Sequence, residues 1–241
     1  MPAFEAGVPI GAGQRVVLAD EATVHHLLRV LRLRSGDSIR LFHDGTVGTG
    51  IVERISANSV AVVIESSASS LWLNRSLNVV QALIRPQLLD DVVRLCTPLG
   101  VTNIVLFRSA RAQSWNVEAR MERLQEIAAA SAEQSETGII PRVHLAQDIG
   151  GALDCAQPLG RLFVLSPQGG GSLLQAEATG QLAPNGSVTV VIGPEGGLTP
   201  SEEDQLVARG ATSVRLRTGI LRSELAGFAT CLVIRELQTS L

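Results

Sequence analysis

The sequence predicts an α/β protein in which a small β-rich region precedes a larger region built on a parallel sheet. Three observations support this prediction. Short β-branched segments fill the first 70 residues, strands and helices alternate from residue 77 onward, and three late strands end in glycine-containing loops. Buried apolar strands that alternate with helices are typical of a parallel sheet.

The N-terminal region, residues 1–70, is expected to form a small β domain. Its candidate strands are Arg15–Leu18, Ser38–His43 and residues 47–55 and 59–64, with a turn at Asp44-Gly45. One helix interrupts them: Asp20 can cap it, and apolar residues recur behind it at helical spacing, namely Val24, Leu27, Leu28 and Leu31. The serine-rich residues 66–70 are expected to form a linker.

The second region, residues 71–241, alternates between the two kinds of element. Its expected buried strands are residues 77–84, Asn103–Phe107, Arg161–Leu165, 187–192 and 213–216. Its expected helices are residues 88–99, 117–135, 200–209 and 222–237. We therefore predict two domains, 1–70 and 71–241.

Composition narrows the class of protein. The chain has 241 residues, 45% of them hydrophobic and 18% charged, which is typical of a well-packed globular protein and argues against disorder. No apolar run reaches bilayer length, and the first residues lack a basic-then-apolar pattern, so we expect a cytoplasmic protein without a membrane partner. The net charge of −3 does not itself suggest nucleic-acid binding, and every basic residue is arginine.

The three cysteines, Cys96, Cys155 and Cys231, lie far apart in apolar surroundings. An odd and scattered set argues against both a disulfide framework and a zinc cluster. We expect buried free thiols and no metal site.

Glycine-containing loops at residues 166–171, 193–197 and 217–222 follow three of the expected strands. Ligands of α/β sheets bind beyond the carboxyl ends of strands, and glycine lets the backbone approach a ligand closely. The loops therefore predict one pocket lined by backbone, which would suit an adenine and a ribose. Neither the dinucleotide-binding nor the P-loop glycine pattern is present, which disfavours a Rossmann dehydrogenase or a P-loop NTPase.

The residues beside two of these loops are distinctive. Thr199, Pro200 and Glu202 form a helix-start pattern after the second loop. In the last expected helix, Glu224 would favour the helix dipole, whereas Arg222 at the same end is disfavoured and calls for another role.

Four segments together resemble a known family. They are IGPEGGLT (192–199), ILRSE (220–224), HLLRVLRLRSGD (26–37) and AAASAEQS (128–135). In this order they are similar to the 16S ribosomal RNA uridine-N3 methyltransferases, the RsmE type, of the SPOUT superfamily. The resemblance implies an N-terminal PUA-like β-barrel that binds RNA and a C-terminal SPOUT methyltransferase domain with a trefoil knot.

The resemblance also implies S-adenosyl-L-methionine as cofactor, small-subunit ribosomal RNA as substrate and a homodimer. The cofactor-binding residues that it implies are Leu165, Ser166, Ile192, Gly193, Pro194, Glu195, Gly196, Leu216, Gly219, Ile220 and Leu221. The RNA-binding residues are His26, Arg29, Arg32 and Arg34, although a run of arginines on a helix is also typical of a solvated face. The catalytic residues are Arg222, expected to stabilise charge on the uracil oxygens, and Glu224, expected to hold Arg222 or accept the N3 proton.

The chain differs from the family pattern at Ala3, Arg85-Pro86, Thr137 and Leu225. Two other functions are therefore kept open. One is a SPOUT methyltransferase that acts on another RNA or another position, and the other is a non-catalytic RNA-binding or ribosome-assembly protein. Calorimetry of S-adenosylmethionine binding distinguishes them, because a methyltransferase of either specificity should bind this cofactor and a non-catalytic RNA-binding protein should not.

Overall fold

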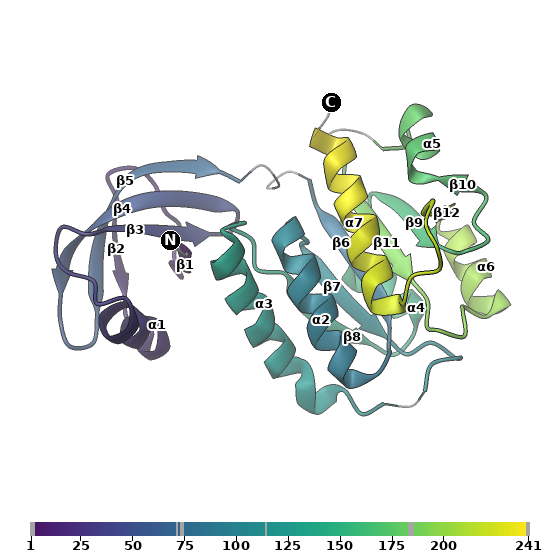
Figure 1. Ribbon diagram of the computed structural model, residues 1–241, viewed down its shortest axis with the longest axis horizontal. Coiled ribbons are helices and arrows are strands. Elements are labelled where there is room, and N and C mark those ends of the chain that lie inside the picture. Colours follow the sequence, from purple (N-terminus) through teal and green to yellow (C-terminus); the bar gives the residue numbers. More distant parts are fainter. Residues whose placement is uncertain (1–2, 71, 73–74, 114, 183–185, 240–241) are drawn as a thin grey trace. The chain divides into compact units, whose positions relative to one another are not determined.

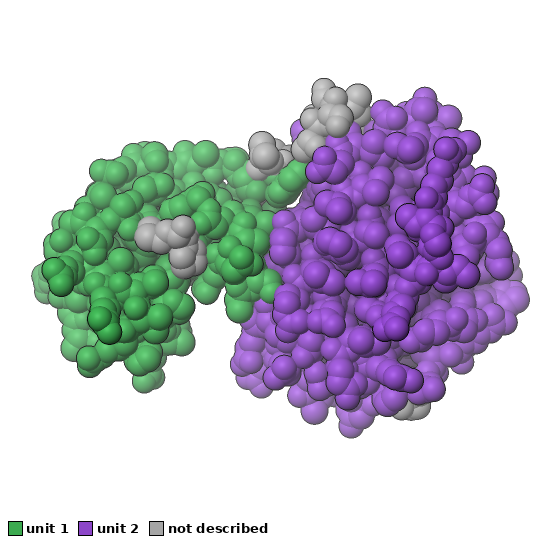
Figure 2. All heavy atoms as spheres, in the orientation of Figure 1, with its two compact units in different colours: residues 1–73, 130–139 green, residues 74–129, 140–241 purple. Residues whose placement is uncertain are grey.

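The computed structural model describes residues 3–70, 72, 75–113, 115–182 and 186–239, and it forms two compact units. Met1–Leu73 and Ala130–Ile139 make the first unit; Asn74–Ala129 and Ile140–Leu241 make the second (Figure 2). The predicted boundary after residue 70 adjoins residue 71, which lies outside the described residues, so the division at 70 stays a prediction.

The first unit is a mixed sheet of five strands. They are β1 (Ala3–Glu5), β2 (Arg15–Leu18), β3 (Ser38–His43), β4 (Thr46–Ile55) and β5 (Val60–Ser69), in the order β1-β3-β4-β5-β2. β1 runs parallel to β3, and the other neighbours are antiparallel. Inward-facing apolar side chains such as Ile39 and Leu41 form its core.

Two predictions in this sheet have opposite outcomes. The turn between β3 and β4 is confirmed, because Asp44 and Gly45 have φ angles of 42° and 76°, as a two-residue hairpin turn requires. The linker at residues 66–70 is wrong, because β5 continues to Ser69 and pairs with β4 from Thr46 to Thr49. The polar side chains of this stretch are exposed, but its backbone still completes the sheet.

The predicted helix of the first unit begins as expected and continues differently. α1 spans Glu21–His25, and the Asp20 side chain accepts the backbone N–H of Thr23 at 2.8 Å. The next turn is a π-helix, η1 (His26–Val30), which buries Leu27 completely. The wider turn thus keeps Leu27 inside the core, while His26 before it and Arg29 after it stay exposed.

The second unit has a parallel sheet of seven strands in the order β10-β12-β9-β11-β6-β7-β8. The strands are β6 (Leu77–Ala82), β7 (Asn103–Phe107), β8 (Arg142–Ala146), β9 (Arg161–Leu165), β10 (Gly171–Ser172), β11 (Val188–Ile192) and β12 (Thr212–Arg215). The predicted α/β class with a parallel sheet is confirmed. β8 and β10 were not expected, and the trefoil knot stays a prediction.

Helices cover both faces of this sheet. They are α2 (Pro86–Cys96), η2 (Thr97–Leu99), η3 (Glu118–Arg120), α4 (Ile149–Cys155), α5 (Leu173–Ala178), α6 (Pro200–Ala208) and α7 (Ser223–Thr239), together with the first part of α3 (Met121–Ser135), whose residues from Ala130 onward belong to the first unit. α2 and α7 contact each other over one face, and α4 packs on the opposite face (Figure 1). Successive residues of a strand pack into the apolar cores on opposite faces of the sheet, as Val79 and Val80 on β6 do.

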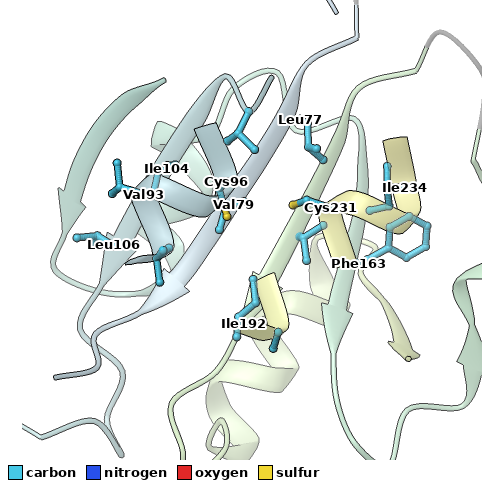
Figure 3. Close-up of a cluster of buried hydrophobic side chains, with 14 of the residues drawn as sticks. Leu77, Val79, Val93, Cys96, Ile104, Leu106, Phe163, Ile192, Cys231 and Ile234 are labelled. Carbon is cyan, nitrogen blue, oxygen red and sulfur yellow. The ribbon is translucent and has the colours of Figure 1, made fainter. Parts of the chain in front are cut away.

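The core beneath α2 and α7 contains two of the three cysteines. Cys96 on α2 and Cys231 on α7 are buried in the same apolar cluster as Val79, Phe163 and Ile192 (Figure 3). Cys155 is exposed at the end of α4, so the expectation of a buried thiol is wrong there. None of the helices in the described part of the chain is long and apolar enough to cross a membrane.

Candidate active site at the carboxyl ends of the strands

A large cavity lies at the carboxyl ends of β9, β11 and β12. Its volume is about 740 Å³, and its walls come from the loops after these strands together with the start of α7. The structure therefore brings together the three glycine-containing loops that the sequence singled out. A pocket at this end of a parallel sheet is the usual ligand site of α/β folds.

Every residue predicted to bind the cofactor lines this cavity: Leu165, Ser166, Ile192, Gly193, Pro194, Glu195, Gly196, Leu216, Gly219, Ile220 and Leu221. Other lining residues were not predicted, among them Arg111, Gln168, Glu203, Arg215 and Ser223. Most of these lie within or next to the predicted loops, whereas Arg111 follows β7 in a different part of the chain.

Residues 193–199, which we call the fixed loop, are held at their far end by α6. The Thr199 hydroxyl accepts the N–H of Glu202 at 3.3 Å, and the Glu202 carboxylate accepts the N–H of Thr199 at 2.7 Å. Pro200 occupies the first turn of the helix. The predicted helix start is confirmed as a reciprocal capping box.

A buried amide holds the near end of the fixed loop. Gln81 on β6 donates from Nε2 to the Ser223 hydroxyl at 2.8 Å, and Ser223 donates to the carbonyl oxygen of Gly193 at 2.9 Å. Gln81 has no exposed surface. Sequence reasoning missed this chain, although a glutamine inside the apolar run of β6 was a signal that it needed a polar partner.

Arg111 fixes the middle of the same loop. Its Nη1 donates to the carbonyl oxygens of Gly196 at 3.3 Å and Leu198 at 3.0 Å. Gly197 adopts a φ of +71°, in the left-handed region that favours glycine. The loop is therefore supported at its start, middle and end.

Residues 217–222, which we call the open loop, have far fewer supports. Within the described residues, no side chain from elsewhere hydrogen-bonds to them, and the Thr218 hydroxyl bonds only to the adjacent Gly219 carbonyl. Ile220 lines the cavity and is 89% exposed. Apart from Gly219 and its two chain neighbours, no atom of the described residues lies within 4 Å of the place where a Cβ on Gly219 would stand, so this position faces open space.

The structure places the two predicted catalytic residues differently. Arg222 lines the cavity and is exposed, and its guanidinium has no ion pair among the described residues. Glu224 is 7% exposed in the first turn of α7 and does not line the cavity. In the described part of the chain the two side chains make no ion pair, so they are not brought together.

The predicted RNA-binding residues lie in the first unit. His26 and Arg29 are on η1, and Arg32 and Arg34 follow it; all four are exposed. The His26 ring packs edge-on against Phe4, with ring centres 5.5 Å apart. Arg32 has a φ of 56°, so the chain turns sharply where these side chains emerge. The segment thus exposes three arginines.

No group of three or more histidine, cysteine or acidic side chains within the described ranges is arranged to hold a metal ion. The site is instead a cavity whose walls are loop backbone, apolar side chains and a few charged groups. These features define an α/β enzyme that binds a nucleotide-like ligand at the edge of its parallel sheet.

Comparison with known proteins specifies the enzyme. Residues 73–235 match the model of the RNA methyltransferase domain, and residues 13–65 match the model of the RNA methyltransferase PUA domain. The chain therefore belongs to the RNA methyltransferase family with an N-terminal PUA domain. The family predicted from the sequence motifs is confirmed.

Relatives with similar sequences align with most of this chain. Ribosomal RNA small subunit methyltransferase E of Rickettsia conorii is 27% identical over 233 residues, covering 95% of this chain and 92% of the relative. Its namesake in Bacillus subtilis is 29% identical over 213 residues, covering 84% and 83%. The crystal structure of ribosomal RNA small subunit methyltransferase E from Neisseria gonorrhoeae, bound to S-adenosyl methionine, superposes with a TM-score of 0.78 at 26% identity, covering 98% of each chain.

Proposed function

We propose that this protein transfers the methyl group of S-adenosylmethionine to N3 of a uridine in small-subunit ribosomal RNA. The cavity formed by the three glycine-containing loops is the observation that carries this proposal. The relatives named for small-subunit ribosomal RNA support the substrate, and the cofactor-bound structure supports the methyl donor.

The residues of the cavity fit this cofactor. The volume of about 740 Å³ falls within the range of roughly 300–1,000 Å³ that is usual for ligand sites. Peptide groups of three loops suit an adenine and a ribose. The lining also carries charges of both signs, carboxylates and guanidinium groups, which suits a ligand with cationic groups and a carboxylate. When bound, the cofactor supplies a methyl group carried on a sulfonium.

Arg222 is positioned to act on the substrate base. Methylation at N3 requires loss of the N3 proton, which leaves negative charge on the uracil oxygens O2 and O4. The Arg222 guanidinium lines the cavity without a carboxylate partner in the described structure, so its N–H groups are available to stabilise that charge. Holding the base in line with the methyl group supplies the rest of the rate enhancement.

Glu224 serves α7 in this proposal. Its side chain lies outside the cavity lining, which supports a structural role over that of the base. In this proposal the N3 proton passes to solvent water. A carboxylate in the first turn stabilises the helix dipole, and α7 begins directly after Arg222. Glu224 therefore positions the start of the helix that carries Ser223.

The first unit is proposed to bind the RNA. The match to the PUA domain model and the exposed His26, Arg29, Arg32 and Arg34 support this role. Arginine pairs well with phosphate oxygens, which favours contacts to the RNA backbone. We further propose that residues 1–70 and 71–241 are separate domains and that the protein acts in the cytoplasm.

We also propose a homodimer. Apolar side chains of the open loop and α7 remain exposed in the single chain: Ile220 at 89%, Leu225 at 40% and Leu232 at 39%. Burial of such side chains against a second copy would remove apolar surface from water. Sedimentation equilibrium tests this, and a mass of one chain at micromolar concentration would refute it.

The decisive experiment maps methylated nucleotides by mass spectrometry in ribosomal RNA from cells lacking the protein. Loss of one N3-methyluridine from small-subunit RNA, restored by the wild-type gene and by purified protein with S-adenosylmethionine, is expected. Loss of a different methyl group would mean another RNA or position. Absence of cofactor binding in calorimetry would instead mean a non-catalytic RNA-binding protein.

A further inference from the structure

A second, smaller cavity of about 290 Å³ adjoins the large one within the second unit. It is lined by Arg85, Arg111, Gln113, Trp115, Glu195 and Gly196. Arg111, Glu195 and Gly196 also line the large cavity, so the two spaces share a wall. A group bound in the smaller cavity would therefore lie next to the proposed methyl donor.

The smaller cavity carries unpaired positive charge. Arg85 stands at the start of α2, is exposed, and makes neither an ion pair nor a side-chain hydrogen bond to any described residue. Both hydrogen bonds of Arg111 come from Nη1, which leaves the N–H groups of Nε and Nη2 without a partner in the described structure. Two guanidinium groups thus share the cavity with one carboxylate, that of Glu195.

Several arginines elsewhere in the same unit, by contrast, already have a carboxylate partner. Arg94 pairs with Asp91 at 2.7 Å, and Arg209 pairs with Asp154 at 3.0 Å. Arg108 likewise pairs with Glu118 at 2.5 Å. Arginines that already have a carboxylate partner have fewer N–H groups free for an anionic ligand. Arg85 and Arg111 have no carboxylate partner among the described residues, so N–H groups of both remain free for such a ligand.

Trp115 adds a flat apolar surface to the two cations. It is half-buried and packs against the main core of the unit, which holds its indole in place. Its carbonyl oxygen accepts an N–H of Arg108 at 3.2 Å, which fixes the backbone behind the ring. Single-stranded RNA is recognised by this combination, because bases stack on aromatic rings while arginines contact phosphates.

We propose that the smaller cavity binds a single-stranded nucleotide of the RNA substrate, with its phosphate on Arg85 and Arg111 and its base against Trp115. This inference rests on the proposed methyl transfer to RNA. It places part of the substrate site in the second unit, in addition to the RNA-binding role proposed for the first. The amide of Gln113 provides a donor and an acceptor at the rim.

A second anion has the same chemistry for these arginines, namely the carboxylate of the cofactor's amino-acid part. Arg85 separates these two sources, because it lines only the smaller cavity. If it binds RNA, its removal weakens RNA binding and leaves cofactor affinity unchanged. If it binds the cofactor, the dissociation constant for S-adenosylmethionine rises.

The test compares Arg85→Ala with Arg142→Ala, which removes the same charge from an exposed residue of β8 that lines neither cavity. Steady-state methylation of small-subunit RNA gives KM and kcat, calorimetry gives cofactor affinity, and filter binding gives RNA affinity across salt concentrations. For Arg85→Ala we expect KM for RNA to rise about tenfold and the salt slope to fall by about 0.7, as for one lost phosphate contact. Arg142→Ala should match the wild type.

A second pair of variants tests the stacking surface. Trp115→Leu should raise KM for RNA about tenfold, whereas Trp115→Phe, which keeps an aromatic ring, should restore most of the affinity. An unchanged KM in Arg85→Ala, or a loss of cofactor affinity in its place, would overturn the inference. A wild-type protein that binds no cofactor would overturn the proposed function itself, so the two failures are distinguishable.

Discussion

The fixed loop and the open loop line the same cavity, but the protein supports them very differently. The fixed loop, residues 193–199, is bonded by Ser223 at its start, Arg111 in its middle and Glu202 at its end. The open loop, residues 217–222, receives no side-chain hydrogen bond from the rest of the described chain. A loop held in place before binding saves the free energy of ordering it, so we assign cofactor affinity mainly to the fixed loop.

The open loop carries the charged group proposed for the chemistry. Arg222 ends this loop, and its guanidinium is available for a substrate. Changes to the supports of the fixed loop should therefore alter cofactor affinity or stability, and changes to the open loop should alter turnover. Four predictions test this division.

The largest effect is expected for Arg222→Ala. Removing one donor to a developing oxyanion lowers kcat by about 10²–10³-fold, while cofactor affinity should stay unchanged. Single-turnover methylation and calorimetry measure the two quantities. Arg217→Ala is the matched control, because Arg217 lies in the same loop but does not line the cavity. Unchanged turnover in Arg222→Ala would remove the proposed role.

A smaller effect is expected for Gln81→Leu, which removes the buried amide that holds the near end of the fixed loop. The lost hydrogen bond to Ser223 should weaken cofactor binding by about 1 kcal/mol, or roughly fivefold. Calorimetry measures this for Gln81→Leu, Ser223→Ala and the double variant.

The double variant should bind the cofactor about as well as the single variant with the lower affinity, because both changes break the same chain of hydrogen bonds. Fully additive losses would show that Gln81 does not act on the loop through Ser223.

The next prediction concerns the capping box of α6, which holds the far end of the fixed loop. Thr199→Ala removes the cap of α6 and should cost about 1 kcal/mol of unfolding free energy, with some loss of cofactor affinity. Asp148→Ala is the control, because the Asp148 side chain caps α4 by accepting the N–H of Gly151 at 2.8 Å, and the loop before α4 does not line the cavity. Chemical denaturation should show a stability loss in both variants. Equal cofactor affinity in the two would contradict the role of the cap in the site.

The sequence predicted the parts of the site that depend on local signals. Two of the three loops follow the largely apolar strands β9 and β11, and the cap at Thr199 depends on only four consecutive residues, so both features could be recognised without the structure. The turn at Asp44-Gly45 was predictable for the same reason.

Long-range pairing accounts for what the sequence did not predict. The serines of residues 66–70 predict a linker, but the backbone of residues 66–69 pairs with β4. Gln81 and Ser223 are 142 positions apart, and Arg111 is 85 positions from Gly196, so no local pattern connects them. Residues 130–139 belong to the first unit although they follow the strand β7 of the second. Such contacts depend on the folded topology, which a single sequence does not reveal.

The smallest predicted effect is a pH dependence of the stability that Glu202 adds at the far end of the fixed loop. Burial alone would raise the pKa of Glu202, but hydrogen bonds from the backbone of Thr199 and Ala110 outweigh it and lower the pKa below the ordinary 4.5. A carboxylate with a lowered pKa in the folded state adds stability above the unfolded value, and this stability is lost as pH falls through the folded pKa.

Glu202→Gln cannot titrate, so the Tm difference between wild type and variant should be largest near neutral pH. It should shrink as pH falls below about 4.5, the ordinary glutamate value. Thermal unfolding followed by circular dichroism at several pH values measures it. Glu122→Gln, an exposed carboxylate on α3, reports the general effect of removing one charge. A Tm difference for Glu202→Gln that is constant across this range would show that the carboxylate does not stabilise the end of the fixed loop through its charge.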